Sequence, residues 1–175
     1  MKIAWLFSEN TILGPQIDIG QLHELAPIWG SWRTWRSYGT DNVICYDPAQ
    51  AHQLIEQDYQ KVCNLYVHQT AWEKANKPAG IHAFGGDFPI NVQHPDDIVC
   101  MHLAASQNQI VLMVGFSLEQ KQTVTPYIEL IAQSVQTNPK TQWVLVDHPK
   151  DLLSLFAGLK NITCDTMNNV LGLLS

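Results

Sequence analysis

Charged side chains are scarce in this chain, because Asp, Glu, Lys and Arg together make up 15% of its 175 residues and its only arginines are Arg33 and Arg36. The balance is acidic, with a formal net charge of -6. A protein that binds nucleic acid or an anionic membrane needs a basic patch. We therefore expect neither as a partner. A surface so poor in charge predicts a protein contact instead, and we expect a homo-oligomer.

Long apolar runs are missing as well. No run reaches the roughly 18 residues that a membrane span requires, and the apolar stretch within residues 1–7 is too short for a signal peptide. A cytoplasmic location is expected. The chain contains four cysteines, each in an apolar stretch and none in the close pairs of a zinc or redox motif: Cys45, Cys63, Cys100 and Cys164. We predict that they are unbridged, mostly buried thiols.

Several catalytic motifs are also missing. The chain has no GxSxG, no P-loop and no GxGxxG, so a nucleophile elbow, P-loop phosphoryl transfer and ordinary dinucleotide binding lack sequence support. His94, His102 and His148 do not form a metal-ligand spacing such as HxxxH. The sequence therefore predicts no metal and no cofactor.

Apolar residues make up 46% of the chain, and short β-rich runs alternate with longer amphipathic ones. This alternation is typical of βαβ units. We predict a single α/β domain over residues 1–175, a Rossmann-like three-layer fold with a mostly parallel central sheet. The expected strands are residues 2–7, 43–46, 62–67, 110–114 and 142–146, with weaker strands at 80–84 and 162–164.

Helix starts are marked by an acidic cap followed by proline. Asp47-Pro48 and Asp147-His148-Pro149 both follow expected strands. Each is typical of a helix start, because an Asp side chain caps free N–H groups and proline is tolerated in the first turn. The expected helices cover residues 48–58, 94–106, 125–137 and 152–159, and a last helix begins at Asp165.

Polar residues gather where the expected strands end. Ligands of parallel sheets bind beyond the carboxyl ends of the strands, where helix N-termini point their free N–H groups. The residues at this rim are Ser8, Glu9, Asn10, Asp47, His68, Gly86, Asp87, Ser117, Asp147, His148 and Asp165. Each could serve only as a helix cap. As a ligand site, the rim would offer Ser8, Asn10 and Ser117 for binding, and Asp87, Asp147 and His148 as acid and base groups.

The most distinctive segment is PIWGSWRTWRSYGTDN, residues 27–42, in which tryptophans recur every third residue and the two arginines each follow one of them: Trp29, Trp32, Trp35, Arg33 and Arg36. On a helix this spacing would place the indoles along one side, where they could stack on a base while the guanidinium groups hold an anion. Alternatively the tryptophans are core or a dimer contact. Asp41 and Asn42 form a turn or contact ribose hydroxyls.

The string DDIVCMHLAASQNQIVLMVGFSL, residues 96–118, resembles the helix and strand unit of the bacterial sialyltransferase family and of the related pterin-pyrophosphokinase-like domains. In those proteins a small-residue helix precedes an Ile-rich strand, and the loop after the strand helps to build a nucleotide-derived donor site. The resemblance implies an α/β fold, and it carries that loop over to Gly115 and Ser117.

Two functional hypotheses follow. In the first, the domain binds, and in one version also processes, a small anionic nucleotide-like or sugar-nucleotide ligand at the carboxyl ends of the strands, with Arg33 and Arg36 on the anion. In the second, it is a non-catalytic interaction protein, such as a virion-associated one, whose segment 27–42 forms an oligomer or partner interface. The sequence leaves both open.

Overall fold

The fold is an eight-stranded sheet in which every neighbouring pair of strands is parallel. A computed structural model describes residues 1–88, 94–118 and 125–175. The strand order is β5-β4-β3-β2-β1-β6-β7-β8. The strands are β1 (Ile3–Phe7), β2 (Ile28–Ser31), β3 (Asn42–Cys45), β4 (Asn64–His68), β5 (Ile81–Phe84), β6 (Ile110–Val114), β7 (Gln142–Val146) and β8 (Ile162–Asp165). The predicted α/β class and parallel sheet are confirmed.

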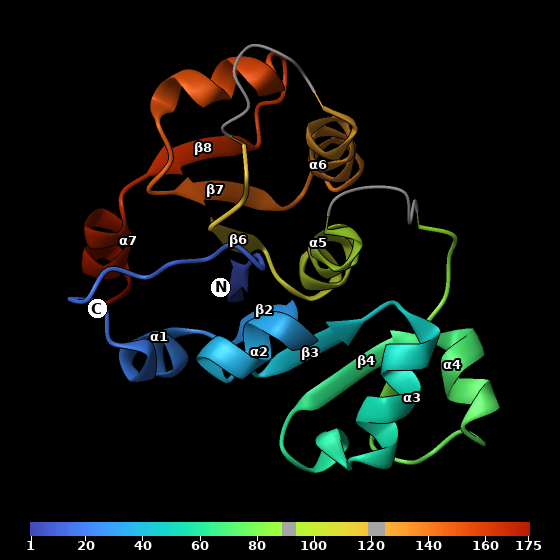
Figure 1. Ribbon diagram of the computed structural model, residues 1–175. Coiled ribbons are helices and arrows are strands. Elements are labelled where there is room, and N and C mark those ends of the chain that lie inside the picture. The colour runs from blue at the N-terminus through green and yellow to red at the C-terminus, as the bar shows by residue number, and fades with distance from the viewer. Residues whose placement is uncertain (89–93, 119–124) are drawn as a thin grey trace.

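Helices cover both faces of this sheet, as Figure 1 shows. One face carries α5 (Pro95–Gln107), α6 (Pro126–Thr137) and the 3₁₀ segment η2 (Lys150–Phe156). The opposite face carries α1 (Ile19–Leu25), α2 (Trp32–Tyr38), α3 (Pro48–Glu56), η1 (Tyr59–Lys61), α4 (Gln69–Lys74) and α7 (Met167–Leu174). The result is the Rossmann-like three-layer arrangement, in which strands buried on both faces read as continuous apolar runs.

Side-chain caps explain where several helices begin. Asp47 accepts a hydrogen bond from the Gln50 backbone N–H at 2.7 Å, and Pro48 opens α3, as the sequence predicts. Ser31 caps α2 in the same way, by accepting from the Thr34 N–H at 3.3 Å. Capping by these short polar side chains satisfies N–H groups that the first helical turn leaves without partners.

The sequence predicts six of the eight strands closely and β8 within one residue, but it misses β2. Residues 27–42 do not form one helix. They contribute β2, the short helix α2 and the start of β3, so Trp29 lies on a strand while Trp32 and Trp35 lie on a helix. The missed strand is short and lacks the alternation of a half-buried strand, because all of its residues are buried.

Apolar side chains pack on both faces of the sheet. Trp5, Trp29 and Trp143 are the largest fully buried side chains, and they come from three different strands. All four cysteines are free: Cys45 and Cys100 are buried, whereas Cys63 and Cys164 are half-buried. Within the described residues, no helix has the length and apolar character needed to cross a membrane.

Candidate functional site

The strand order reverses between β1 and β6, which lie side by side at the centre of the sheet. From β1 the chain winds outward to β5, returns to β6 and winds outward again to β8. In open parallel sheets such a switch point opens a crevice at the carboxyl edge, because the two adjoining loops leave in opposite directions. The candidate site is therefore expected beside Phe7 and Val114, the last residues of these strands.

The loop after β1 closes over the end of β6 at this point. Ser8 Oγ donates to the Gly115 carbonyl at 2.6 Å, and Thr11 Oγ1 donates to the Val114 carbonyl at 2.8 Å. Gly115 has φ +75°, and a Cβ there would lie 2.6 Å from the Thr11 backbone nitrogen. Ser8 and Gly115, both predicted ligand contacts, thus hold this loop against β6, and neither lines the neighbouring cleft.

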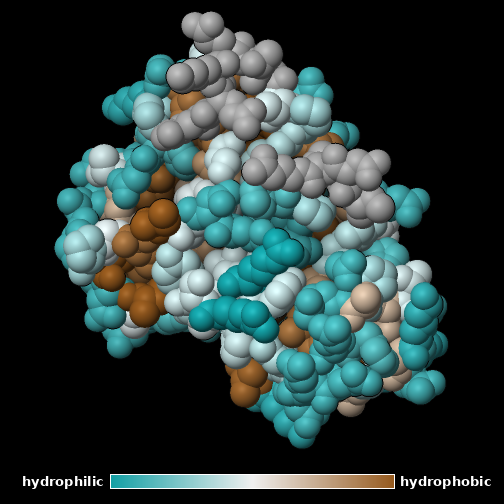
Figure 2. All heavy atoms as spheres, viewed as in Figure 1, coloured by the Kyte–Doolittle hydropathy of each residue, from teal (hydrophilic) through white to brown (hydrophobic). Residues whose placement is uncertain are grey.

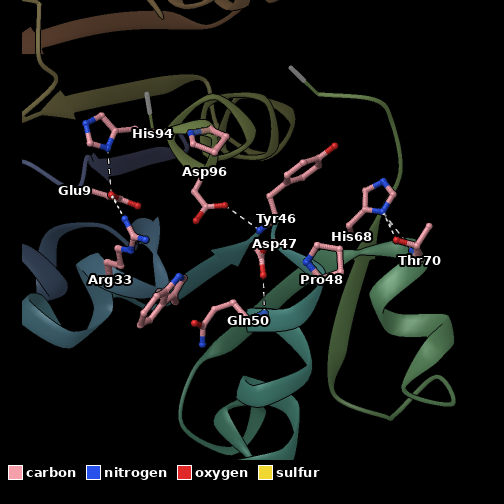
Figure 3. Close-up of a pocket in the computed structure, with 12 residues that line it drawn as sticks. Glu9, Arg33, Tyr46, Asp47, Pro48, Gln50, His68, Thr70, His94 and Asp96 are labelled. Carbon is pink, nitrogen blue, oxygen red and sulfur yellow. Dashed lines mark hydrogen bonds and ion pairs between the residues drawn. The ribbon is translucent and has the colours of Figure 1, made fainter. Parts of the chain in front are cut away.

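The cleft opens next to the switch point, over the carboxyl ends of β1 to β4, and has a volume of about 640 Å³. Figure 3 shows side chains from several elements converging on it, and Figure 2 shows that the surface over α2 is hydrophilic. The lining residues are Glu9, Trp32, Arg33, Tyr46, Asp47, Pro48, Gln50, His68, Thr70, His94, Pro95 and Asp96. Clefts of roughly 300–1,000 Å³ suit small-molecule ligands.

Glu9 is the centre of a hydrogen-bond network at one end of the cleft. Its Oε2 accepts from Arg33 Nη1 at 3.1 Å and from His94 Nδ1 at 3.1 Å. The Glu9 and His94 side chains are 11% and 15% exposed, whereas Arg33 is 64% exposed. Figure 3 shows Glu9 between Arg33 on one side and His94 on the other. Arg33 therefore reaches from solvent into a largely desolvated acidic site.

The hydrogen bonds around His94 are satisfied by one neutral tautomer. His94 Nδ1–H donates to Glu9, which leaves Nε2 as the acceptor for the Asn10 side-chain amide at 3.0 Å. The same amide nitrogen donates to Ser117 Oγ at 2.8 Å. Asn10 and Ser117, two predicted ligand contacts, thus belong to a chain of hydrogen bonds that links the cleft to the loop after β6. They orient His94 and do not line the cleft themselves.

Asp96, in the first turn of α5, is the buried carboxyl group of the cleft. Its side chain is one of the few charged ones in the core, at 8% exposure, and its Oδ1 accepts from the Tyr46 backbone N–H at 2.8 Å. Burial raises the pKa of Asp96 to about 7, and the nearby Glu9 carboxylate adds to this shift, whereas the Tyr46 hydrogen bond and the Arg33 guanidinium oppose it. Asp96 can therefore carry a proton near neutral pH.

Asp97, the next residue, points away from the cleft into the core. Its Oδ2 accepts from the Tyr127 hydroxyl at 2.7 Å, and the residue is 1% exposed. Burial raises its pKa well above the usual range, although the Tyr127 hydroxyl and the nearby Glu9 backbone N–H oppose the shift. Within the described residues, Oδ1 is buried and forms no hydrogen bond of good geometry. Asp97 thus joins α5 to α6 beneath the cleft.

The Trp-Arg segment is divided between the core and the cleft. Trp29 is 1% exposed, packs on Tyr66 with ring centroids 5.2 Å apart, and offers no surface to a ligand or a partner. Trp35 packs on Tyr59 at 4.8 Å. Only Trp32 lines the cleft, where the guanidinium groups of both Arg33 and Arg36 lie over its ring, at 5.5 and 4.8 Å. Arg36 does not line the cleft.

The three predicted acid and base groups are not brought together. Asp87 follows β5 and is exposed, whereas Asp147 and His148 follow β7, and the strands β4, β3, β2, β1 and β6 lie between β5 and β7 in the sheet. Asp147 has φ +57° and accepts from the Met167 backbone N–H at 2.8 Å, which makes it part of the start of α7. None of the three lines the cleft.

Asp41 and Asn42 lie at the amino edge of the sheet, opposite the cleft. Asp41 accepts from the Ile28 backbone N–H at 2.7 Å and contacts His23 Nδ1 at 3.0 Å. Asn42 begins β3, and its Oδ1 accepts from Asn64 Nδ2 at 3.2 Å. Both residues therefore fasten strands to their neighbours, which agrees with the turn interpretation and not with contacts to a ligand in the cleft.

Sequence reasoning placed Glu9, Asp47 and His68 at the rim but did not select them, and it overlooked Tyr46, Gln50, Thr70 and Asp96. A usable signal existed, because each of these residues lies at or within two residues after the end of a strand, or in the first turn of a helix. Parallel strands place all such residues at one edge. The sequence does not show which strands are neighbours, so it could not group them.

The described residues contain no group of three or more His, Cys, Asp or Glu side chains arranged to hold a metal ion. Comparisons with family models, with curated proteins and with solved structures return no match. The chemistry of the cleft is therefore the basis for a functional inference.

Proposed function

We propose that the protein binds a small anionic ligand, of the nucleotide-like or sugar-nucleotide class, in the cleft at the carboxyl ends of β1 to β4. The observation that carries this proposal is the position of Arg33. It is one of only two arginines in the chain, and it lies at the mouth of a cleft of about 640 Å³ beside the indole of Trp32.

Arg33 retains the capacity to bind an anion although it pairs with Glu9. Only its Nη1 donates within the described residues, to Glu9 Oε2, and the side chain is 64% exposed. A guanidinium group has five N–H donors in a rigid fork, so the remaining N–H groups can bind a phosphate or carboxylate. The Glu9 carboxylate then holds the fork in place and limits the rotamer entropy that binding removes.

The rest of the cleft suits the uncharged part of such a ligand. Trp32 and Tyr46 offer aromatic surface, and Gln50, Thr70 and His68 offer hydrogen-bonding groups along the ends of β3 and β4. Figure 3 shows His68 and Thr70 at the end of the cleft away from Glu9 and Arg33. A ligand with an anion at one end and a base or sugar at the other would match this distribution.

The test compares two arginines of the same helix. Replacing Arg33 with Ala removes a charge-assisted contact worth about 1.5–3 kcal/mol, so it should weaken the ligand by roughly ten- to a hundredfold. Arg36→Ala removes an equal charge over the same indole but outside the cleft, and it should bind nearly as the parent protein does. Calorimetry against a panel of nucleotides and sugar nucleotides, at constant ionic strength, measures both.

Two results would count against the proposal. The first is the absence of binding across the whole panel by the parent protein. The second is an equal loss of affinity in both variants, which would indicate a general effect of positive charge on α2 and not a contact made within the cleft.

A further inference from the structure

Among the residues that the structure describes, the proposed cleft has more acidic side chains than cationic ones. Glu9, Asp47 and Asp96 line it, with Arg33 as its one guanidinium, and the buried Asp97 lies directly behind Asp96. An anion entering a desolvated site of this composition meets like charge, which is unfavourable at low dielectric. The anion therefore needs one of these carboxyl groups to be neutral.

Glu9 and Asp47 both accept hydrogen bonds from neighbouring donors. Glu9 Oε2 accepts from both Arg33 and His94, and Asp47 Oδ1 accepts from the Gln50 N–H as the cap of α3.

Asp96 differs from both. Within the described residues its one hydrogen bond is the Tyr46 N–H on Oδ1, so Oδ2 has no donor, although the residue is only 8% exposed. Figure 3 shows its carboxyl group between Glu9 and the Tyr46 backbone. Burial disfavours the charged form of a carboxyl group, and an oxygen without a donor does nothing to offset that cost.

We propose that the cleft takes up its anionic ligand together with one proton, which Asp96 holds and donates in a hydrogen bond to an anionic oxygen of that ligand. The proposal rests on the proposed function, since it requires an anion in this cleft. The only bond exchanged is to hydrogen: a proton leaves an acid in the solvent and forms an O–H bond on the Asp96 carboxylate, and this O–H donates to the ligand. Arg33 and Asp96 would then bind the anion from different elements, α2 and α5.

The groups that face Asp96 support this assignment. Asp97 is on the same helix, Glu9 on the loop after β1, and Asp47 at the end of β3, and all three would repel a charge on Asp96. Arg33 on α2 is the cation that opposes them, and the remaining titratable neighbours are His94 and the buried thiols of Cys45 and Cys100. The pKa of about 7 that this environment produces allows uptake of the proton near neutral pH.

The sign of the pH dependence follows. If the bound state requires protonated Asp96, affinity is constant well below pH 7 and falls about tenfold for each pH unit above it. Proton uptake on binding is correspondingly small at pH 6 and approaches one proton per ligand at pH 8.5. An anion held by Arg33 alone would show neither effect, because a guanidinium group keeps its charge over this range.

The experiment is titration calorimetry with UDP-glucose and with inorganic sulfate, whose diphosphate and sulfate groups keep the same charge between pH 6 and 8.5. Each titration is repeated in two buffers of different ionisation enthalpy, and the difference in measured heat gives the number of protons taken up. The parent protein should take up close to one proton at pH 8.5. Asp96→Asn supplies a neutral donor of the same shape, so it should bind without proton uptake and with an affinity independent of pH.

Asp151→Asn is the matched control, because it makes the same change at an exposed position in η2, away from the cleft, and should leave proton uptake intact. Binding by the parent protein without proton uptake overturns this inference but leaves the proposed function standing. Proton uptake that persists in Asp96→Asn also overturns it, and assigns the proton to another group of the cleft. No binding of either probe overturns the inference, and absence of binding across the whole panel of nucleotides and sugar nucleotides overturns the proposed function as well.

Discussion

Two adjacent aspartates have different surroundings because of helix geometry. Consecutive residues of an α-helix point in directions about 100° apart, so Asp96 lines the cleft while Asp97 faces Tyr127 on α6. Both carboxyl groups are buried, and burial raises both pKa values. Asp96 is therefore accessible to a ligand in the cleft. Asp97 is not, so a ligand cannot compensate for the loss of folding stability that burial of its carboxylate causes.

The pH dependence of stability tests the position of Asp97. Its pKa is raised in the folded state, so it contributes its full stability below the unfolded pKa of about 3.9, and this contribution is lost as pH rises. Asp97→Asn removes the titration and keeps an oxygen for the Tyr127 hydroxyl. The melting temperature of this variant should therefore exceed that of the parent protein by an amount that grows between pH 5 and pH 8.

Asp151→Asn again serves as the control, since an exposed carboxyl group should change the melting temperature little at any pH. A difference between Asp97→Asn and the parent protein that shrinks with rising pH would show that Asp97 is stabilised as a carboxylate.

At the scale of elements, the loop after β1 connects fold and site. It carries Glu9 and Asn10, and its neighbours Ser8 and Thr11 fasten it to the end of β6. The position of Glu9 against Arg33 and His94 therefore depends on a contact made at the switch point of the sheet. We infer that weakening this contact would loosen the acidic end of the cleft without touching a residue that lines it.

Substitution of Gly115 tests that fastening. Gly115→Ala places a Cβ against the Thr11 backbone, whereas Gly39→Ala, at the end of α2, places a Cβ in open space. The backbone is left-handed at both positions, with φ of +75° at Gly115 and +62° at Gly39. Both variants should lose about 1 kcal/mol for that backbone conformation. Gly115→Ala should lose clearly more free energy of unfolding than Gly39→Ala, as measured by urea denaturation, because the Thr11 backbone must move to make room for the added methyl group.

Gly115→Ala should also weaken ligand binding, since the displaced loop carries Glu9. Equal losses of stability in the two glycine variants would mean that the loop accommodates the added methyl group and that its close approach to β6 is not needed.

At the scale of the whole molecule, the order of the strands predicts where the structure opens first. β1 and β6 lie inside the sheet and are buried on both faces, whereas β5 and β8 are its edges. Edge strands can separate without disrupting the rest of the sheet. Amide hydrogen exchange should therefore be slowest in β1 and β6, close to the rate set by global unfolding, and faster by orders of magnitude in β5 and β8.

Hydrogen exchange measured by mass spectrometry at peptide resolution gives these rates. The same strands are then followed at urea concentrations too low to unfold the whole protein. Exchange in β5 as slow as in β1 would show that the edge is held by contacts that the described residues do not reveal.

Local patterns predicted much of the architecture. The run Ile110 to Val114 is apolar throughout, so a strand covered on both faces follows from its residues alone, and Asp47-Pro48 marks the start of α3 by cap chemistry that needs no tertiary contact. Local spacing also produced the wrong prediction for Trp29. A spacing of three suggests a helix, but the burial of β2 between β1 and β3 overrides local preference.

The sequence by itself determined the α/β class, the parallel sheet and the polar rim, because periodicity and capping are local properties that survive in any arrangement of the strands. Only the tertiary structure decided which rim residues meet. The order β5-β4-β3-β2-β1-β6-β7-β8 separates Asp87 from Asp147 and brings Glu9, Arg33 and Asp96 together. These contacts join residues far apart in the chain, so they depend on strand neighbours that no local pattern specifies.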